Sequence, residues 1–353
     1  MSVVYKKLED VCEILDSRRV PITAKDRKAG TYPYYGANGL QDYVADYIFD
    51  DELVLLAEDG GNFGSKERPI AYRVSGKCWV NNHAHVLKAK PNMHVDYLCY
   101  ALMFYDTEGL VNGATRQKLT QAAMRQMVIP YRDMTAQLQI IKKISQIVRS
   151  IEKRKEELQL LDQLVKSRFI ELFGDPIKNT QHRPTTAFVN VVTMQRGFDL
   201  PVQDRKQSGN IPVYGSNGVL DHHNQAKVCN GGVITGRSGT IGKVFYTTGA
   251  YWPLNTTLFS VDIHENNIIY LAHLVRMFNL DRFTEGTGVP TLNRNKFHSA
   301  PIIDVPIDEQ NQFAAFVEQT DKSKYYSSLS FRYCQAAANT YRQEWMTCLT
   351  SDF

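Results

Sequence analysis

The chain of 353 residues has few cysteines and no long apolar run, and both shortages exclude classes of protein. Its six cysteines lie far apart, and none has C-x-x-C spacing. This pattern argues against a disulfide framework or a zinc site and favours free thiols in a reducing compartment. No run of about 18 apolar residues occurs, so we expect no membrane-spanning helix. The chain does not open on a charged segment followed by an apolar one, so we expect no secretion and predict a cytoplasmic protein.

Sequence motifs that carry catalysis are also missing. The chain contains no G-x-S-x-G, H-E-x-x-H or G-x-G-x-x-G segment. The run GRSGTIGK, at Gly236–Lys243, resembles a phosphate-binding loop, but its spacing is one residue too long. Val244 also stands where such a loop needs a serine or threonine to hold a metal ion. We therefore interpret the run as a hairpin turn.

Histidines and carboxylates give no convincing site either. The segments His83-Ala84-His85 and Asp221-His222-His223 could ligate a metal, but each lacks a third ligand at a suitable spacing. We therefore expect surface or core histidines and no metal. A nuclease-like set of three carboxylates and a lysine has no counterpart in the second half of the chain; its members are Asp51, Glu52, Glu58 and Lys66. The chain is predicted to bind a partner without catalysing a reaction, and no cofactor is expected.

The composition is that of a globular protein with two or three domains. Hydrophobic residues make up 43% of the chain and charged residues 22%. The net charge of +4 permits a polyanionic partner, but a surplus this small does not indicate one by itself.

The clearest positive feature is an internal repeat. Residues 30–42 and 209–221 are identical at seven of thirteen positions, with PYYGANG in the first segment and PVYGSNG in the second. Further matches follow in the same order: LVLLAEDGGNFG with GGVITGRSGTIG, Trp79 and Asn82 with Trp252 and Asn255, and GATRQKL with GTGVPTL. On this alignment Arg237 stands where the first copy has Asp59. The chain therefore holds two divergent copies of one domain.

Each copy is predicted to be rich in strands. Glycine turns separate short β-branched and aromatic runs, and one short helix is expected in each copy, at 97–104 and 268–278. The Asn-Gly pair is a strong turn signal because both residues tolerate positive φ. We interpret the repeated segment as a structural turn with packed rings, formed by Tyr35, Gly36, Asn38 and Gly39 and by Tyr214, Gly215, Asn217 and Gly218.

A different kind of sequence separates the copies. Residues 135–173 contain neither proline nor glycine, and apolar residues recur at alternating steps of three and four, which is typical of a coiled-coil seam. The seam residues are Ile141, Ile144, Val148, Ile151, Leu158, Val165, Phe169 and Leu172, with Lys155 and Asp162 as polar members. Gly174 and Asp175-Pro176 are stop signals. An apolar stripe needs a partner, and the candidate is the segment from Asp308 to about Met346, which also lacks proline and glycine.

Taken with their order, these features resemble the specificity subunit of type I restriction-modification systems. Two divergent copies with Y-G-x-N-G and G-x-x-x-x-L segments are each followed by a long helix. The ELFGDP run at Glu171–Pro176 and the P-x-D-E-Q run at Pro306–Gln310 are similar to signatures of that family. The resemblance covers nearly the whole chain.

The resemblance implies an α+β fold in which long helices, paired as an antiparallel coiled coil, separate two repeated target-recognition domains. The expected divisions are 1–134 and 176–306 for the two domains, 135–175 for the central spacer helix and 307–353 for the C-terminal helix. Each domain would read one half of a bipartite site in double-stranded DNA. The coiled coil would set the spacing and dock methyltransferase subunits, two per chain, with restriction helicase-nuclease subunits as further partners. Methylation and cleavage would belong to those partners.

Base reading needs cations and donors on loops of a rigid scaffold. Basic residues recur at corresponding loops of the two copies: Lys25, Arg27, Lys28, Lys66, Arg68, Arg116 and Lys118 in the first, and Arg205, Lys206, Arg237, Lys243, Arg294 and Lys296 in the second. Contacts to phosphates would position the protein, and only a few residues would specify bases. A single lysine or arginine is more often a solvated surface charge, so the recurrence at equivalent loops is what supports the set.

Two other functions are compatible with parts of the pattern. A two-repeat adaptor that binds proteins without DNA specificity would have the same architecture. A self-sufficient restriction enzyme would need nuclease and methyltransferase motifs on this chain, and the missing motifs argue against it.

Overall fold

The computed structural model describes residues 4–113, 116–206, 208–286 and 290–347, and only the backbone of 337–347. The repeated segments GATRQKL and GTGVPTL are therefore described in part, and residues 348–353 of the expected C-terminal helix lie outside the description. The chain divides into two compact units. One contains Met1–Glu152 with Arg332–Phe353, and the other contains Lys153–Phe331. The first unit holds the first copy of the repeat, and the second unit holds the second copy.

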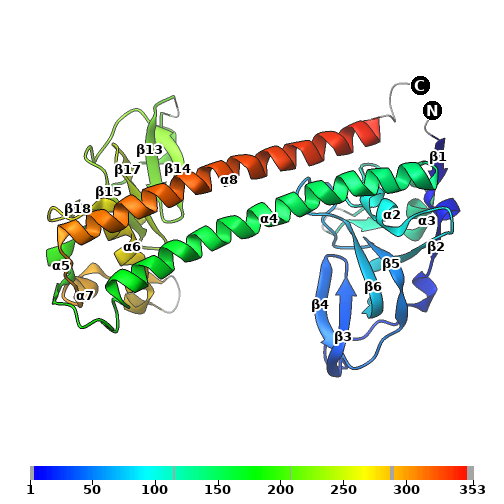
Figure 1. Ribbon diagram of the computed structural model, residues 1–353, viewed down its shortest axis with the longest axis horizontal. Coiled ribbons are helices and arrows are strands. Elements are labelled where there is room, and N and C mark those ends of the chain that lie inside the picture. Colours follow the sequence, from blue (N-terminus) through cyan, green and yellow to red (C-terminus); the bar gives the residue numbers. More distant parts are fainter. Residues whose placement is uncertain (1–3, 114–115, 207, 287–289, 348–353) are drawn as a thin grey trace. The chain divides into compact units, whose positions relative to one another are not determined.

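The first copy is built around one mixed sheet (Figure 1). Its strands and helices are β1 (Val4–Lys7), α1 (Leu8–Val11), β2 (Cys12–Ile14), the 3-10 helix η1 (Asp16–Arg18), β3 (Ala29–Gly36), β4 (Gly39–Val44), β5 (Phe49–Ala57), β6 (Ala71–Val80), β7 (Ala84–Ala89), α2 (Val95–Leu102), β8 (Val111–Asn112), β9 (Lys118–Leu119), α3 (Gln121–Gln126) and β10 (Val128–Tyr131). Six strands form the sheet in the order β2-β7-β5-β6-β3-β4, and β1 pairs with β10. The central strand β5 ends in the apolar run Leu53–Ala57, which is fully buried because both faces of the sheet are covered there.

The second copy repeats this order of elements. Its elements are β11 (Thr185–Ala187), α5 (Phe188–Val191), β12 (Thr193–Arg196), η2 (Val202–Asp204), β13 (Ile211–Gly215), β14 (Gly218–His223), β15 (Gly232–Gly236), β16 (Val244–Thr247), β17 (Trp252–Pro253), β18 (Thr257–Asp262), α6 (Ile268–Phe278), η3 (Leu280–Phe283), β19 (Thr284–Glu285), β20 (Thr291–Leu292), α7 (Arg294–His298) and β21 (Pro301–Ile303). Strands β16 and β17 together take the place of the long strand β6, so the sheet is divided into β12-β18-β15-β16 and β14-β13-β17.

Strand pairing confirms the duplication that the sequence predicts. Tyr34 lies beside Trp79 in a parallel pair of β3 and β6, and Val213 lies beside Trp252 in the parallel pair of β13 and β17. The hairpin closed by each Asn-Gly turn carries a register shift just before the repeated Tyr-Gly. The expected fold class, a mixed helix and strand protein with two copies of one domain, is therefore confirmed.

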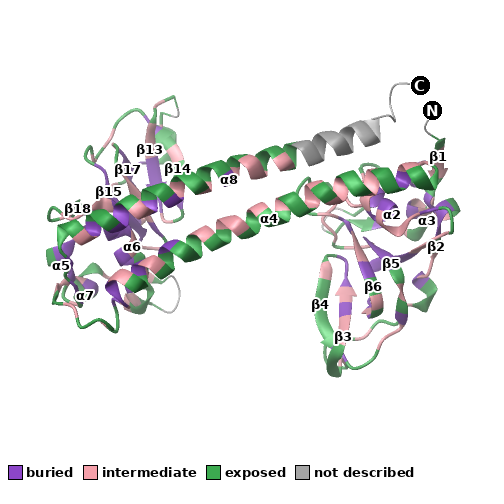
Figure 2. Ribbon diagram, in the orientation of Figure 1, coloured by how far each residue is buried: buried purple, intermediate pink, exposed green. Residues whose placement is uncertain are grey.

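Two unbroken helices follow the copies: α4 (Met134–Phe173) after the first and α8 (Ile307–Thr347) after the second. Helix α4 ends where the sequence predicts, because Gly174 adopts the left-handed conformation (φ +76°) of a helix C-cap. Figure 2 shows that burial in α4 changes along its length. The apolar seam residues from Ile144 to Leu158 are half-buried and the polar member Lys155 is exposed, whereas Val165 and Phe169 are buried.

Within the second unit, the end of α4 packs against the start of α8. Phe169 and Phe173 contact Phe313 with ring centroids 5.4 Å and 5.6 Å apart, and Lys324 ion pairs with Asp162 at 2.8 Å. Later residues of α4 contact earlier residues of α8, so the two segments run antiparallel. Among the described residues, no helix is long and apolar enough to cross a membrane.

Candidate nucleic-acid interface

Three loops of the first copy meet through hydrogen bonds. They are the β3–β4 hairpin turn, the glycine-rich turn after β5, and the segment Arg116–Thr120. The side-chain amide of Asn38 donates to the Gly60 carbonyl at 3.0 Å, and the Gly60 amide donates to the Gln117 carbonyl at 3.1 Å. The Leu119 amide donates to the Glu58 carbonyl at 2.7 Å. The repeated turn is therefore a corner that holds two other loops beside it.

The corresponding loops of the second copy meet in the same way. Lys243, at the end of the glycine-rich turn, donates to the side chain of Asn217 at 2.5 Å. The Leu292 amide donates to the Arg237 carbonyl at 2.8 Å. This bond corresponds to that between Leu119 and Glu58, so the structure aligns Arg237 with Glu58. The sequence alignment with Asp59 was wrong by one residue.

The glycine-rich segment Gly236–Lys243 is a connection between strands, as predicted. Strands β15 and β16, which flank it, pair in antiparallel register from Gly232 opposite Thr247 to Thr235 opposite Val244. A phosphate-binding loop would instead lead from a strand into a helix.

The repeated tyrosines pack as the turn interpretation expects. Tyr35 contacts Tyr72 with centroids 5.9 Å apart, and Tyr214 contacts Tyr251 at 5.8 Å. Burial raises the pKa of both repeated phenols, so they stay protonated at neutral pH. Their rings therefore stiffen the corner from which the loops extend.

Two of the predicted DNA-binding arginines make an internal ion pair that recurs between the copies. Arg27 lies 3.3 Å from Asp42, and Arg205 lies 3.4 Å from Asp221. Arg27 also stacks over the ring of Tyr34, 4.2 Å from its centroid. These guanidinium groups tie the segment before each hairpin to the hairpin itself.

The cations of the Arg116–Thr120 segment lie in a local charge network. Asp59 lies 2.6 Å from both Arg116 and His83. Lys118 lies 3.1 Å from Glu58. The Arg116 side chain is still 60% exposed. The network therefore orients a cation that remains accessible to DNA.

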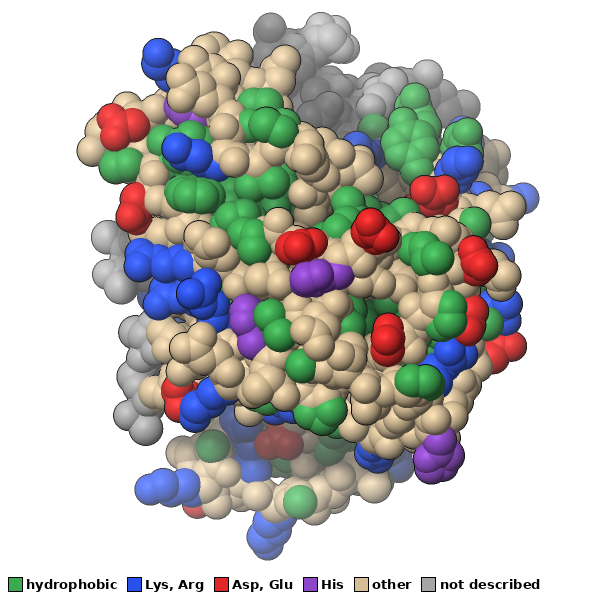
Figure 3. Space-filling model, turned by 90° about the vertical axis from the view of Figure 1, so that its left-hand side faces the viewer, with side chains coloured by type: hydrophobic (Ala, Val, Ile, Leu, Met, Phe, Trp, Pro, Cys, Tyr) green, Lys and Arg blue, Asp and Glu red, His purple; other side chains and the backbone are tan. Residues whose placement is uncertain are grey.

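The other predicted cations lie on the surfaces of the two copies. In the second copy, Lys296 ion pairs with Glu285. Arg237 is half-buried, and its backbone is held on both sides, since its amide donates to the Thr256 carbonyl at 2.8 Å. Those that are exposed without an ion pair among the described residues are Lys25, Lys28, Lys66, Arg68, Lys206 and Arg294. Figure 3 views the second unit from one end, where several Lys and Arg side chains stand together at the left-hand edge.

The carboxylates of the nuclease-like set do not form a common site. Asp51 pairs with Lys88 at 2.5 Å, and Glu52 pairs with Arg73. Glu58 pairs with Arg19 at 2.6 Å. Each carboxylate therefore has its own cation.

The expectation that the histidine segments lack a third metal ligand was wrong for His85. The fold brings Asp16 and Glu58 to this buried ring, and the three ligand atoms lie within 4.8 Å of one another. Sequence spacing could not show this because Asp16 lies 69 residues before His85. The carboxylates are already neutralised, however, since Arg19 lies 3.5 Å from Asp16 and Lys118 also pairs with Glu58. We therefore interpret the group as an internal charge cluster.

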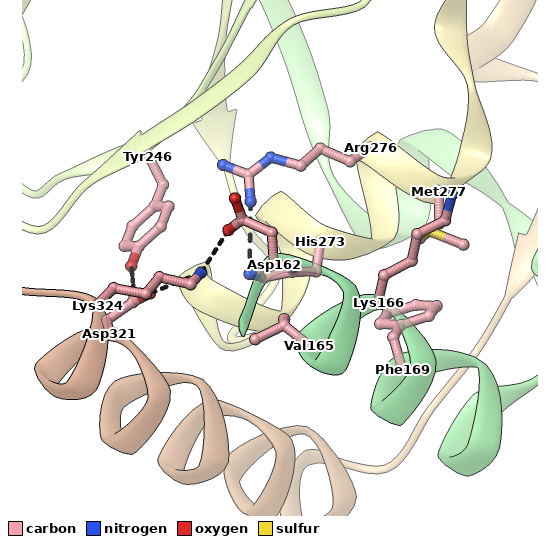
Figure 4. A pocket seen from close by; sticks show the side chains of 10 residues that line it. All are labelled: Asp162, Val165, Lys166, Phe169, Tyr246, His273, Arg276, Met277, Asp321 and Lys324. Carbon is pink, nitrogen blue, oxygen red and sulfur yellow. Dashed lines mark hydrogen bonds and ion pairs between the residues drawn. The ribbon is translucent and has the colours of Figure 1, made fainter. Parts of the chain in front are cut away.

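A pocket of about 550 Å³ lies between α4, α6 and α8 in the second unit (Figure 4). Lys324 bridges Asp162 at 2.8 Å and Asp321 at 3.3 Å across it. Burial, reinforced by neighbouring cations, lowers the pKa of His273 to about 3, so this ring is neutral. Several polar groups of the pocket pair with one another, and we assign them to helix packing.

Comparison with known proteins places both copies in one family of sequences. A family model described as a type I restriction modification DNA specificity domain matches residues 2–161 and 190–325. A Haemophilus influenzae protein named as a type I restriction enzyme specificity subunit is 26% identical over 348 residues, which cover 90% of this chain and 87% of that protein. A Mycoplasma pneumoniae protein named as a type I specificity subunit is 20% identical over 336 residues, covering 90% of this chain and 89% of that protein.

Solved structures share the fold. The S subunit of a type I restriction-modification system from M. genitalium aligns with a TM-score of 0.64 at 12% identity, covering 97% of this chain and 96% of that chain. A chain from a structure of the assembly and conformational transition of a type I system aligns with a TM-score of 0.57 at 12% identity, covering 100% and 98%.

Proposed function

The chain belongs to the family of type I restriction modification DNA specificity domains, and we propose on that premise that each copy reads one half of a bipartite site in double-stranded DNA. The observation that carries this proposal is the repeated meeting of three loops on a common scaffold. The hydrogen bonds from Leu119 to Glu58 and from Leu292 to Arg237 anchor the same loops in both copies. Two copies that share a scaffold and differ in loop side chains are suited to two different half-sites.

The chemistry of these loops supports contacts to both phosphates and bases. The exposed lysines and arginines of each copy can contact phosphates, which position a protein on DNA without reading its sequence. A guanidinium on a fixed backbone can make the bidentate contact that distinguishes guanine in the major groove. Arg237 fits this second role, because its amide and carbonyl are both hydrogen-bonded.

We assign the long helices to spacing and to partner docking. Helix α4 continues without a break from residues of the first unit into residues of the second, so its length is available as a spacer. The antiparallel packing of α8 on the end of α4 supports a paired stalk, and the proposed partners are methyltransferase subunits, joined by restriction helicase-nuclease subunits. Methylation and cleavage would be carried by those subunits in the cytoplasm. The domain divisions 1–134, 135–175, 176–306 and 307–353 belong to this proposal.

A gel-shift assay with random-sequence and genomic duplexes, at low and at physiological salt, tests the proposal. We expect binding by the chain with its methyltransferase partner, affinity that falls steeply with salt, and enrichment of a two-part sequence with a fixed gap. Binding to the partner without any affinity for duplex DNA would instead identify a protein-interaction adaptor.

A further inference from the structure

His85 lies buried directly beneath the segment that carries Arg116 and Lys118. Its ring is 0% exposed. Nδ1 lies 2.6 Å from a carboxylate oxygen of Asp16, and Nε2 lies 2.9 Å from the carbonyl oxygen of Leu119. One imidazole therefore connects η1, strand β7 and the Arg116–Thr120 segment.

The hydrogen-bond geometry determines the protonation of this ring. A carbonyl oxygen only accepts, so Nε2 must carry a hydrogen. Asp16 accepts further bonds from the Val86 amide at 2.8 Å and from Gln121 at 3.0 Å. Burial would raise the pKa of Asp16, but these bonds and the contact with His85 lower it below its ordinary value. Asp16 is then a carboxylate that can only accept, so Nδ1 must carry a hydrogen as well. A neutral imidazole has a single N–H, so both acceptors are satisfied together only by a ring that carries a hydrogen on each nitrogen.

Two carboxylates lie beside the ring. Asp16 and Glu58 face His85, with Glu58 3.6 Å from Nδ1. Arg19 and Lys118 are the other cations of the cluster, and both contact Glu58. A neutral ring with its hydrogen on Nδ1 would still donate to Asp16, but its Nε2 lone pair would then face the Leu119 carbonyl oxygen.

The second copy has no such arrangement at the corresponding place. Strand β18 pairs with β15 in the second copy as β7 pairs with β5 in the first. Leu258 lies opposite Thr235, and it takes the place of His85, which lies opposite Leu56. Leu258 is 1% exposed. The second copy holds its loop through the Leu292 to Arg237 bond, so the ionic support from His85 distinguishes the first copy.

We propose that His85, held as the imidazolium, is a positioning residue for DNA reading by the first copy. This role rests on the proposed function. The ring connects the Leu119 carbonyl to Asp16 and so fixes the direction in which Arg116 and Lys118 extend. Loss of this contact should weaken reading of one half-site and leave the other unchanged.

The protonation is tested without DNA. In full-length protein with ¹⁵N-labelled histidine, assigned by comparison with His85→Gln, both ring nitrogens of His85 should show protonated chemical shifts at neutral pH. An unprotonated ring nitrogen would overturn the assignment of the imidazolium.

The positioning role is tested with the methyltransferase complex and duplexes in which one mapped half-site is kept and the other is scrambled. In the His85→Gln variant, the side-chain amide can still donate to the Leu119 carbonyl, but its oxygen then faces the Asp16 carboxylate. We expect the affinity for the first half-site to fall about tenfold or more, as for loss of a charged hydrogen bond, with no change for the second. Adding Asp16→Asn supplies a donor to that oxygen and should restore most of the lost affinity.

Equal loss at both half-sites, no loss at either, or no restoration by the double variant would overturn the positioning role. Leu258→Val, made in the second copy, is the matched control and should spare the first half-site. If the unaltered complex bound neither duplex, the proposed function itself would fail, while the ring-nitrogen spectrum would still decide the protonation of His85.

Discussion

Arg27 and Arg205 pair with corresponding aspartates of the two copies, Asp42 and Asp221. These ion pairs distinguish cations that hold the fold from cations that can reach a ligand. The Arg205–Asp221 pair is largely buried, with side chains 12% and 13% exposed. Removing either partner would leave a charge without compensation, which is costly at a buried site. We therefore assign these arginines to the scaffold and propose Arg237 as a candidate for base reading.

Substitution of Arg237 by alanine should relax the specificity of one position in one half-site. Its backbone is fixed by bonds to Thr256 and Leu292, so the side chain projects from a defined place. If it reads a base, Arg237→Ala should cost about 1–3 kcal/mol of discrimination at that position. Methylation-site mapping of the variant complex measures the effect.

Arg149→Ala, at an exposed position on α4 outside the loops, is the matched control and should leave the mapped site unchanged. A uniform loss of affinity across sequences would make Arg237 a phosphate contact. No loss would make it a surface residue.

Single residues were predictable from the sequence where they belong to a local pattern. The turn motif was found because Gly39 and Gly218 must adopt positive φ, and both do, at +111° and +109°. The contact of His85 with Asp16 was not predictable, because it depends on how β7 meets η1. Its only sequence signal is a histidine within the otherwise apolar start of the AHVLKA strand.

At the scale of elements, an aromatic cluster holds the end of α4 to α6 and α8. Phe173 lies 5.2 Å from the ring of Tyr270 and 5.6 Å from that of Phe313. Arg183 lies over the ring of Phe173, 5.3 Å from its centroid. Edge-to-face pairs of this kind add to the free energy of burial, so the cluster anchors both long helices to the second unit.

Phe173→Ala should therefore destabilise the second unit strongly. Its ring is fully buried, and removing it would leave a cavity, at a cost of about 3–5 kcal/mol in the free energy of unfolding. Chemical denaturation followed by far-UV circular dichroism measures the change. Leu164→Ala on the same helix is the control, since Leu164 is 48% exposed and should cost no more than about 0.5 kcal/mol. Equal effects of the two substitutions would contradict the packing described here.

Long helices were predicted better than strands. The proline-free and glycine-free run predicted a helix over 135–173, and α4 spans Met134–Phe173. The division of one long strand into β16 and β17 was missed, because their pairing partners β15 and β13 lie apart in the sequence. Local signals fix where a helix begins and ends, whereas strand pairing depends on distant contacts.

The spacer role of α4 predicts the outcome of an insertion. Four helical residues added after Glu156 would lengthen the helix by about 6 Å and rotate one end by roughly 40°. The described contacts between α4 and α8 lie after this point, so the packing of the second unit is kept. Since stacked bases rise about 3.4 Å, methylation mapping should show the same half-sites with a gap longer by one or two base pairs. An active complex with unchanged spacing would show that α4 is only a docking stalk.

At the scale of the whole molecule, the chain consists of one scaffold used twice with different loop chemistry. The first copy supports its Arg116–Thr120 segment with a buried charge cluster, whereas the second places Leu258 and Arg237 at the corresponding positions. Two copies that read different half-sites are expected to differ in this way, both in the loop side chains and in the buried residues that support the loops. The repeat was visible in the sequence because the scaffold needs the same turns and aromatic rings in both copies. The target bases could not be predicted from the sequence, because they depend on loop geometry.

Exchange of one copy is the most direct test of this organisation. Residues 1–134 would be replaced by the corresponding domain of a family member whose bipartite site is known, and methylation sites of the hybrid complex would be mapped across a genome. We predict that one half-site changes to that of the donor while the other half-site is retained. A hybrid that remains active but reads two altered halves would contradict independent reading by the two copies.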